Sequence, residues 1–460
     1  MARGSVPSAV ALGVPQARAR TGGGRLMLAL LATLQFQLQA PSLAAVRDDS
    51  FPTVTLPEAL RRATGLDPSY VAAVGLVDNA RWARRSAFAV FLLPAVAVET
   101  DATKNLPAFF NFGTLRPESY AVSAQVAARF DLFTGGQKVA ELTRSAAVLD
   151  AAHAGELQAR FNAAFETEAT YYAVVSDAEL LRVARERAQR AEQQLGVARA
   201  RVVSGAAVQT DSLQLRLELS KAQVGLLVQQ TALRVARLSL GSRIGAVGPV
   251  DAVPLDSVLP ATPPLTLDAA VEEAANQGPS YRQARALERA AAAVFRGRLG
   301  TYLPRVSLTG VGIGYSNSFY PRAAKFTQLT LTVTLPIWDN FQRQTLISQA
   351  RVTRDILRAQ RDSAERSIRR DVTAAYDGYV TARAAADIAA QAVAVARESY
   401  RVQQSRYRAG ASTILDLLKA QSDLDDAESG LVAARYAARL ALAGLETIVG
   451  RRLFPEQEYR

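Results

Sequence analysis

The sequence predicts a mainly α-helical chain with a small β part, built from two copies of one unit. Three observations lead to this prediction. Short motifs recur in the same order 205 to 211 residues apart, two segments of 67 residues contain no proline, and strand-like alternation occurs in each half. Apolar residues make up 49% of the 460 positions and charged residues 21%, a composition typical of a folded chain.

The first 44 residues are typical of an export signal. Four arginines and no acidic residue stand in the first 25 positions, and a short apolar run follows from Leu26 to about Leu38. Pro41-Ser42-Leu43-Ala44 then provides small residues for a cut after Ala44. A membrane anchor is the alternative, but the run is well short of the ~20 residues that span a bilayer. We therefore expect a signal peptide at 1–44.

The rest of the chain is expected to consist of two repeats. The recurring motifs are Thr55–Ala59 and Thr266–Ala270, Leu93-Pro94 and Leu303-Pro304, Phe133 and Trp338 each followed four residues later by glutamine, and the turns Gly205–Asp211 and Gly410–Asp416. Residues 246–265 hold five prolines, which favours an extended linker. We predict a first repeat at 45–245, this linker at 246–265, a second repeat at 266–450 and a C-terminal tail at 451–460.

Each repeat contains a predicted pair of strands. Residues 120–132 and 328–335 alternate between apolar and polar side chains, a period of two that marks a strand with one apolar face. Their partners are expected at about Pro94–Thr103 and Pro304–Tyr315. Strands of about ten residues or slightly more have the length of tilted transmembrane β-strands. A soluble β-layer packed on helices remains the alternative.

Long helices are expected on both sides of each strand pair. Gln137–Val203 and Gln342–Arg408 each have 67 residues without proline, so each would be about 100 Å long at ~1.5 Å per residue. A glycine turn and a second helix follow each of them, at about Gln209–Ile244 and Ser412–Val449.

The spacing of leucine and alanine predicts how the shorter helices pack. A heptad seam in the second repeat comprises Leu417, Leu424, Leu431, Ala438 and Leu445, with Ala420, Ala427, Ala434, Ala441 and Ile448 three residues further on. Such a seam indicates coiled-coil packing. The helices before the strands, about Asp67–Leu92 and Pro279–Tyr302, together with those after the turns nearly match the length of one long helix. We therefore expect two shorter helices stacked end to end beside each long one.

The composition excludes many kinds of catalytic and metal site. There is no cysteine and one histidine, His153, which rules out disulfides, cysteine zinc sites and any site that needs two imidazoles. Gly310, Gly312 and Gly314 lie within a strand pattern, so they do not indicate a phosphate loop. We expect no enzyme activity and no cofactor. The formal charge of +12 is spread along the helices, so nucleic acid is not an expected partner.

Four strands cannot cross a membrane alone, because open sheet edges would leave backbone groups unsatisfied in lipid. Two or more chains would have to share a barrel. On the Leu-Pro strand starts, Phe133–Gln137, Trp338–Gln342 and the two glycine turns followed by heptads, the chain resembles the outer-membrane efflux protein family, the TolC-like channels of Gram-negative bacteria. The resemblance covers about residues 53–450. It implies a homotrimer with a 12-stranded transmembrane β-barrel and a long α-helical coiled-coil barrel through the periplasm.

The resemblance also implies a function and its partners. Such a channel lies in the outer membrane, in contact with its lipid, and conducts substrate passively from a periplasmic adaptor (membrane fusion) protein and an inner-membrane pump to the exterior. The adaptor would dock on the turns Ser204-Gly205-Ala206 and Ala409-Gly410-Ala411. The glycines could equally serve only to reverse the chain. A periplasmic coiled-coil protein with a structural role, and no channel, is the alternative function.

The resemblance places a gate near the second turn. Asp416 corresponds to an aspartate that forms a ring at the entrance, and Tyr407, Thr210 and Asp211 correspond to residues that tie neighbouring helices together. Helix capping is the alternative role for the two aspartates. Two departures stand out. Lys419 occupies the position of a second acidic ring, and Ser412 that of a basic locking residue, which leaves open the ion selectivity and how the closed state is held.

Overall fold

The computed structural model describes residues 51–112, 115–254, 263–316 and 324–453. The expected signal peptide and residues 454–460 of the expected tail lie outside them. In chain order the elements are β1 (Thr53–Val54), α1 (Leu56–Leu66), α2 (Pro68–Leu92), β2 (Ala95–Asn111), β3 (Arg116–Phe133), α3 (Gln137–Val203), α4 (Gln209–Arg243), β4 (Asp251–Ala252), α5 (Leu267–Gln277), α6 (Pro279–Leu299), the 3-10 helix η1 (Gly300–Tyr302), β5 (Arg305–Ser316), β6 (Ala324–Thr334), α7 (Gln342–Arg408) and α8 (Ile414–Val449).

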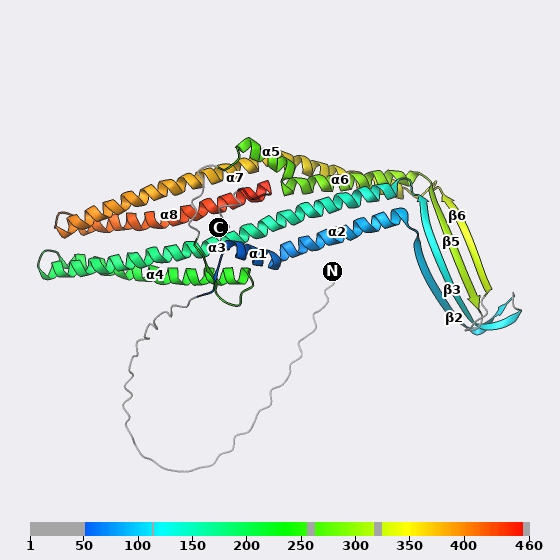
Figure 1. Ribbon diagram of the computed structural model, residues 1–460, viewed down its shortest axis with the longest axis horizontal. Coiled ribbons are helices and arrows are strands. Elements are labelled where there is room, and N and C mark those ends of the chain that lie inside the picture. The colour runs from blue at the N-terminus through cyan, green and yellow to red at the C-terminus, as the bar shows by residue number, and fades with distance from the viewer. Residues whose placement is uncertain (1–50, 113–114, 255–262, 317–323, 454–460) are drawn as a thin grey trace, which may run out of the picture. The chain divides into compact units, whose positions relative to one another are not determined.

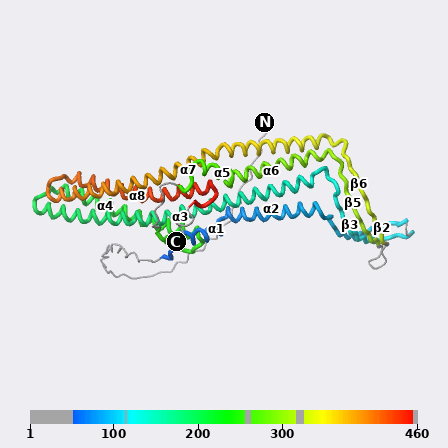
Figure 2. Tube along the Cα trace, turned by 45° about the horizontal axis from the view of Figure 1, so that its top comes forward, coloured from blue at the N-terminus to red at the C-terminus, as the bar shows by residue number. Residues whose placement is uncertain are grey.

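The two long helices have the predicted bounds, 67 residues each. α3 packs against α2 in its first half and α4 in its second, while α7 packs in the same way against α6 and α8 (Figures 1 and 2). The predicted end-to-end stacking of shorter helices is therefore confirmed. α8 begins two residues later than predicted, because Thr413 caps its N-terminus.

The four long strands form one antiparallel sheet in the order β2-β3-β5-β6. Val126 of β3 lies between Val98 of β2 and Gly312 of β5. β2 and β3 are longer than predicted, at 17 and 18 residues. Pairing resumes after a register shift between Lys104 and Phe109, although the apolar alternation has ended there. Backbone hydrogen bonding thus extends this hairpin where the side-chain pattern gave no sign of it.

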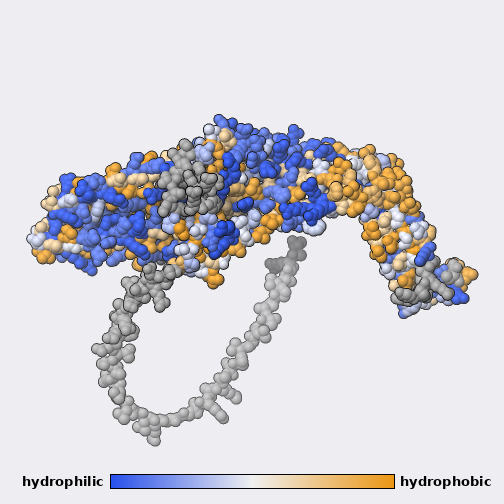
Figure 3. Space-filling model, in the orientation of Figure 1, coloured by the Kyte–Doolittle hydropathy of each residue, from blue (hydrophilic) through white to orange (hydrophobic). Residues whose placement is uncertain are grey.

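Both faces of this sheet are open. On one face Val98 of β2 is 72% exposed and Leu329 of β6 is 73% exposed, and on the other face Glu99 and Thr330 are exposed. The described helices meet the sheet only at one end, and apolar residues gather on it and at its junction with the helices (Figures 1 and 3). The alternative of a soluble β-layer packed on helices is therefore not what the described residues form.

The largest apolar core lies midway along the long helices. It surrounds Tyr171 and Tyr172 of α3 and includes residues of α1, α4 and α8. The hydroxyl of Tyr171 donates to the carbonyl oxygen of Val253 at 2.7 Å, next to a short parallel pair of β1 and β4. The 11-residue helices α1 and α5 and this strand pair were not predicted. For the strand pair the reason is length, because two residues in each strand are too few to show a period.

The heptad seam of α8 is more polar than predicted. Leu417, Leu424 and Leu445 are buried as expected. The buried residues of α8 also include Gln421, Asp425, Glu428, Arg439 and Glu446. α8 contacts α3 as well as α7, so it buries positions beyond a two-helix seam. Asp425 and Glu428 pair with Arg190 of the other repeat, whereas Glu446 pairs with Arg452 just after α8.

Candidate functional site at the turn end of the helices

The two helix turns share one hydrogen-bond pattern. Gly205 and Gly410 adopt left-handed backbone conformations, with φ of 73° and 77°. The amide of Ala206 donates to the carbonyl of Arg201, and that of Ala411 to the carbonyl of Arg406, both at 2.8 Å. These are Schellman-type helix ends, for which glycine is the favoured residue. Each glycine therefore does reverse the chain, and the expected docking role of Ser204–Ala206 and Ala409–Ala411 stays a prediction.

Arg201 joins the two turns. Its guanidinium donates to the backbone oxygen of Tyr407 and, at 3.1 Å, to that of Ala206. It also lies over the Tyr407 ring, 4.7 Å from the centroid, which is a cation–π distance. The Tyr407 hydroxyl donates to Asp211 Oδ2 at 3.3 Å. The Arg201–Tyr407–Asp211 cluster therefore ties α3, α4 and α7 together at this end.

Burial raises the pKa of the Tyr407 phenol, and the negative charge of Asp211 raises it further. The phenol therefore stays protonated and able to donate at physiological pH. Sequence reasoning identified Tyr407 and Asp211 but missed Arg201. The available signal was a basic residue in the last turn of α3 that recurs as Arg406 in α7, where it faces the carbonyl of Ala411 at 3.5 Å.

Asp416 forms a capping box at the start of α8. Its Oδ2 accepts from the Thr413 hydroxyl at 2.7 Å and from the Thr413 amide at 3.1 Å, and its own amide donates to Thr413 Oγ1. The capping alternative thus holds for Asp416. Hydrogen bonds from the Thr413 side chain and backbone hold the pKa of its carboxyl below the ordinary value. At α4 no side-chain capping bond forms, and Asp211 accepts from Tyr407 instead.

The other predicted gate residues have different surroundings. Lys419 pairs with Asp423 at 2.8 Å, one turn along its own helix, and this carboxylate raises the pKa of the Lys419 ammonium. Ser412 Oγ lies 3.1 Å from Gln403 Oε1 and 3.3 Å from Asp416 Oδ2. Thr210 is exposed on the first turn of α4. The positive charge of Lys419 is therefore compensated by Asp423 within one chain.

An ionic cluster with two buried carboxylates lies three to four helical turns from the turn end. Arg190 of α3 donates to Asp425 at 2.7 Å and to Glu428 at 3.2 Å, both on α8. Arg187 pairs with Asp425 at 3.1 Å, and Arg397 of α7 with Glu428 at 3.0 Å. We call these five side chains the ionic cluster. Such pairs hold two surfaces in one register, because moving either surface would leave a buried charge without a partner.

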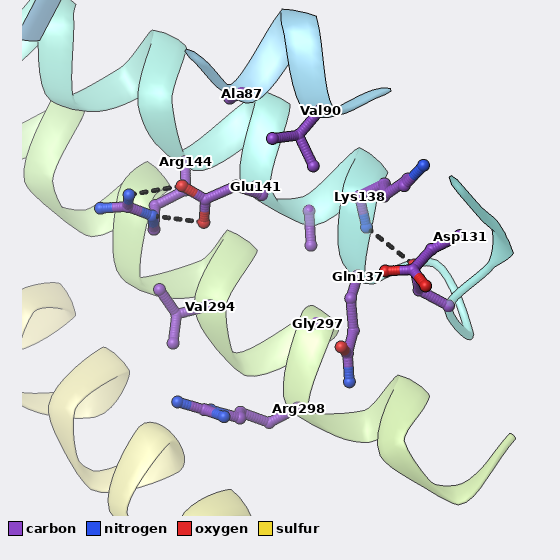
Figure 4. Close-up of a pocket in the computed structure, with 12 residues that line it drawn as sticks. Ala87, Val90, Asp131, Gln137, Lys138, Glu141, Arg144, Val294, Gly297 and Arg298 are labelled. Carbon is purple, nitrogen blue, oxygen red and sulfur yellow. Dashed lines mark hydrogen bonds and ion pairs between the residues drawn. The ribbon is translucent and has the colours of Figure 1, made fainter. Parts of the chain in front are cut away.

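A pocket at the opposite end lies between α2, α3 and α6, where β3 meets α3 (Figure 4). Its lining includes Asp131, Lys138, Glu141 and Arg144. Arg144 is paired with Glu141, and Lys138 lies over the Phe130 ring at 4.2 Å. Two of its positive charges therefore already have partners. No group of His, Asp or Glu among the described residues is arranged to hold a metal ion.

The family model for outer membrane efflux proteins matches residues 60–246 and 270–451. The chain belongs to this family. The protein called Outer membrane protein TolC from Salmonella enteritidis is 27% identical over 184 residues, which cover 38% of this chain and 37% of that relative.

Solved structures of outer-membrane proteins have the same fold. VceC of Vibrio cholerae aligns with a TM-score of 0.73 at 16% identity, over 86% of this chain and 96% of its own. The CmeC outer membrane channel of Campylobacter jejuni aligns with a TM-score of 0.73 at 16% identity, over 86% and 85%. The family model describes outer membrane efflux proteins, and the CmeC structure is described as an outer membrane channel. Within the described ranges, none of the helices is long and apolar enough to span a membrane.

Proposed function

We propose that the chain is the outer-membrane channel of a tripartite efflux or secretion system. Three copies would enclose one pore and conduct substrate passively to the exterior of a Gram-negative-type cell. The observation that carries the proposal is the open four-stranded sheet, bare on both faces and joined end-on to helices of 67 residues.

The sheet accounts for the membrane portion. Leu329, Leu331 and Val333 alternate with threonines along β6, so one face is apolar and the other polar. β2 and β6 are the edges of the sheet, and lipid does not tolerate unpaired edges. Three copies of four strands make a closed barrel of 12, an even number within the range of known outer-membrane barrels. Export by the signal at 1–44 would bring the chain to this membrane.

The turn end accounts for the periplasmic partners. The two turns have the same geometry and expose Gly205 and Gly410, so three chains would present six similar turns in a ring. A periplasmic adaptor protein that docks on such turns would connect the channel to an inner-membrane pump, which supplies the energy. Each chain would supply two turns because it consists of two proposed repeats, at 45–245 and 266–450, which are joined by the proposed linker at 246–265.

The gate would lie at the same end. The Arg201–Tyr407–Asp211 cluster supports a closed state in which the α7–α8 hairpin is held against the α3–α4 hairpin. Opening would release it by an outward untwisting of α7 and α8. Three copies of Asp416 near the axis would favour cations, since Asp423 compensates the charge of Lys419.

Conductance in planar bilayers tests the proposal. Purified protein should insert and give discrete current steps with three-chain stoichiometry, and its preference for K⁺ over Cl⁻ should fall in Asp416→Ala. Protein that stays soluble without detergent and produces no current steps would instead favour the periplasmic coiled-coil alternative.

A further inference from the structure

One arginine in the pocket between α2, α3 and α6 has no acidic partner. The charged side chains of its lining are Asp131, Lys138, Glu141, Arg144 and Arg298. Glu141 accepts two hydrogen bonds from Arg144, at 2.7 Å and 2.5 Å, and Asp131 pairs with Arg129 at 3.5 Å. Both carboxylates therefore already have a partner. In the part of the chain that the structure describes, Arg298 forms no ion pair, and its side chain is exposed.

The rest of the pocket wall is largely apolar. Ala87 and Val90 of α2 lie on one side and Val294 of α6 on another. The volume is about 420 Å³, within the range of roughly 300–1,000 Å³ that is usual for small-molecule sites. Figure 4 shows Arg144 and Arg298 reaching toward the same end of the pocket, from α3 and from α6. The pocket thus combines an apolar wall with a positively charged end.

Close backbone contacts hold two walls of the pocket in place. A Cβ on Gly135 would lie 2.0 Å from the carbonyl oxygen of Gly300, and a Cβ on Gly300 would lie 1.9 Å from that of Gly135. One turn earlier in α6, a Cβ on Gly297 would lie 2.9 Å from the Cβ of Ala140. Glycine at these positions lets the start of α3 and the end of α6 approach directly. A ligand would therefore meet walls that are already formed, which lowers the cost of binding.

The second repeat does not reproduce the charges of the pocket. α3 and α7 each have 67 residues and begin 205 residues apart, so residues with this offset are equivalent. Glu141 and Arg144 of α3 correspond to Leu346 and Gln349 of α7, which are uncharged. The duplicated fold therefore does not itself require these charges, and each chain would have one such pocket.

The pocket lies on the polar side of the sheet. Asp131 follows Gln125 and Arg129 in the polar set of β3, and it pairs in register with Ser307 of β5. In a transmembrane barrel the polar side faces the interior and the apolar side faces lipid. In the proposed channel the pocket would therefore open to the water of the pore, just below the barrel.

We propose that this pocket binds an amphipathic organic anion, a small molecule with an apolar body and a carboxylate or phosphate group. Arg298 pairs with the anionic group, and Val90 and Val294 contact the apolar body. The Oε1 atom of Gln137 accepts from Arg305 at 3.0 Å, so its amide nitrogen is left to donate a second hydrogen bond. The inference rests on the proposed channel and names a class of cargo that its wall would bind.

Isothermal titration calorimetry of the full-length protein in detergent tests the pocket. The probes are naphthoate, naphthyl phosphate and the neutral naphthamide, which has nearly the shape of naphthoate without its charge. Heats of mixing with detergent alone are subtracted. Both anions should bind at one site per chain and about tenfold more tightly than the amide, a difference typical of a hydrogen bond to a charged group.

Variants of α6 test the role of Arg298. Arg298→Gln should weaken naphthoate binding about tenfold and leave naphthamide binding unchanged, whereas Arg298→Lys should retain most of the affinity for naphthoate. Arg296→Gln is the matched control, because Arg296 is also exposed, lies outside the pocket lining and donates to the carbonyl of Ala292 in its own helix. Val294→Trp should weaken the binding of all three probes, because it fills the pocket. Equal losses in Arg298→Gln and Arg296→Gln would overturn the pocket.

The outcomes separate this inference from the channel itself. Unmodified protein that gives current steps in bilayers but binds no naphthoate would overturn the pocket and leave the channel standing. Naphthoate binding that depends on Arg298, in protein that gives no current steps, would support the pocket and contradict the channel. A phospholipid that native mass spectrometry finds on the unmodified protein and not on Arg298→Gln would make lipid the ligand and overturn a soluble cargo.

Discussion

At the scale of single residues, Arg201 donates hydrogen bonds to carbonyl oxygens of both turn regions. Its guanidinium donates to the carbonyl oxygen of Ala206 in its own turn and to that of Tyr407 in the other repeat. The same group lies over the Tyr407 ring. A lysine could supply the charge but not the planar fork that serves two carbonyls at once. The cluster therefore depends on shape as well as charge.

Removing one hydroxyl isolates the tie to Asp211. Tyr407→Phe keeps the ring under Arg201 but loses the bond to Asp211, so it should lower the free energy of unfolding by about 1 kcal/mol. It should also raise the leak current of the closed channel in bilayers. Tyr400→Phe is the matched control, since the Tyr400 hydroxyl bonds Gln194 on α3, further from the turns. A leak that rises equally in both variants would remove Tyr407 from the gate.

Asp416 has a pH dependence with a definite sign. Its folded-state pKa lies below the ordinary 3.8, so the stabilisation from its carboxylate is complete above about pH 3.8 and is lost as the pH falls through the folded value. Cation preference, measured from reversal potentials, should therefore persist from neutral pH to about pH 4. Asp416→Glu should retain it and Asp416→Asn should lose it. A preference that disappears near pH 5 would mean that repulsion between three copies outweighs the bonds from Thr413.

Residue roles could be predicted only where a partner is close in sequence or a motif repeats. The capping of Asp416 by Thr413 spans three residues and was foreseen as an alternative. The contact of Arg201 with Tyr407 spans 206 residues and depends on how two helices pack. The ionic cluster was missed for the same reason, because a heptad pattern records apolar positions and not buried charge pairs.

At the scale of elements, glycine has opposite effects in turns and in helices. Gly410→Ala forces a Cβ into a left-handed conformation and should cost about 1 kcal/mol of stability. Gly378→Ala, in the exposed middle of α7 with open space around the new Cβ, should instead add roughly 0.5–1 kcal/mol. Denaturant unfolding of both variants in detergent measures the difference. A Gly410→Ala variant as stable as the unmodified protein, or more stable, would show that the turn does not require glycine.

The long helices could be predicted to the residue, and the strands could not. A proline-free stretch that ends in a glycine turn defines both ends of a helix, as in α3 and α7. A strand end depends on which backbone groups find partners, and β2 continues to Asn111 past the last alternating residue. The pair of β1 and β4 consists of two residues each, too few for any pattern.

At the scale of the whole molecule, the chain leaves surfaces that one copy cannot cover. Both edges of the sheet are open, its apolar face is bare, and α4 and α7 expose valine and leucine along their length. Within one chain the first repeat already packs against the second, through the pairing of β3 with β5 and the contact of α3 with α8. The same kind of contact between the second repeat of one chain and the first repeat of the next would close a ring. Because each chain has two repeats, the ring would contain an even number of them.

The most direct test is the native mass of the protein extracted from membranes in detergent, corrected for bound detergent. The account predicts three chains, which provide 12 strands and six helical turns at the entrance. Protein recovered as a monomer from the detergent-free soluble fraction would contradict both the shared barrel and the channel.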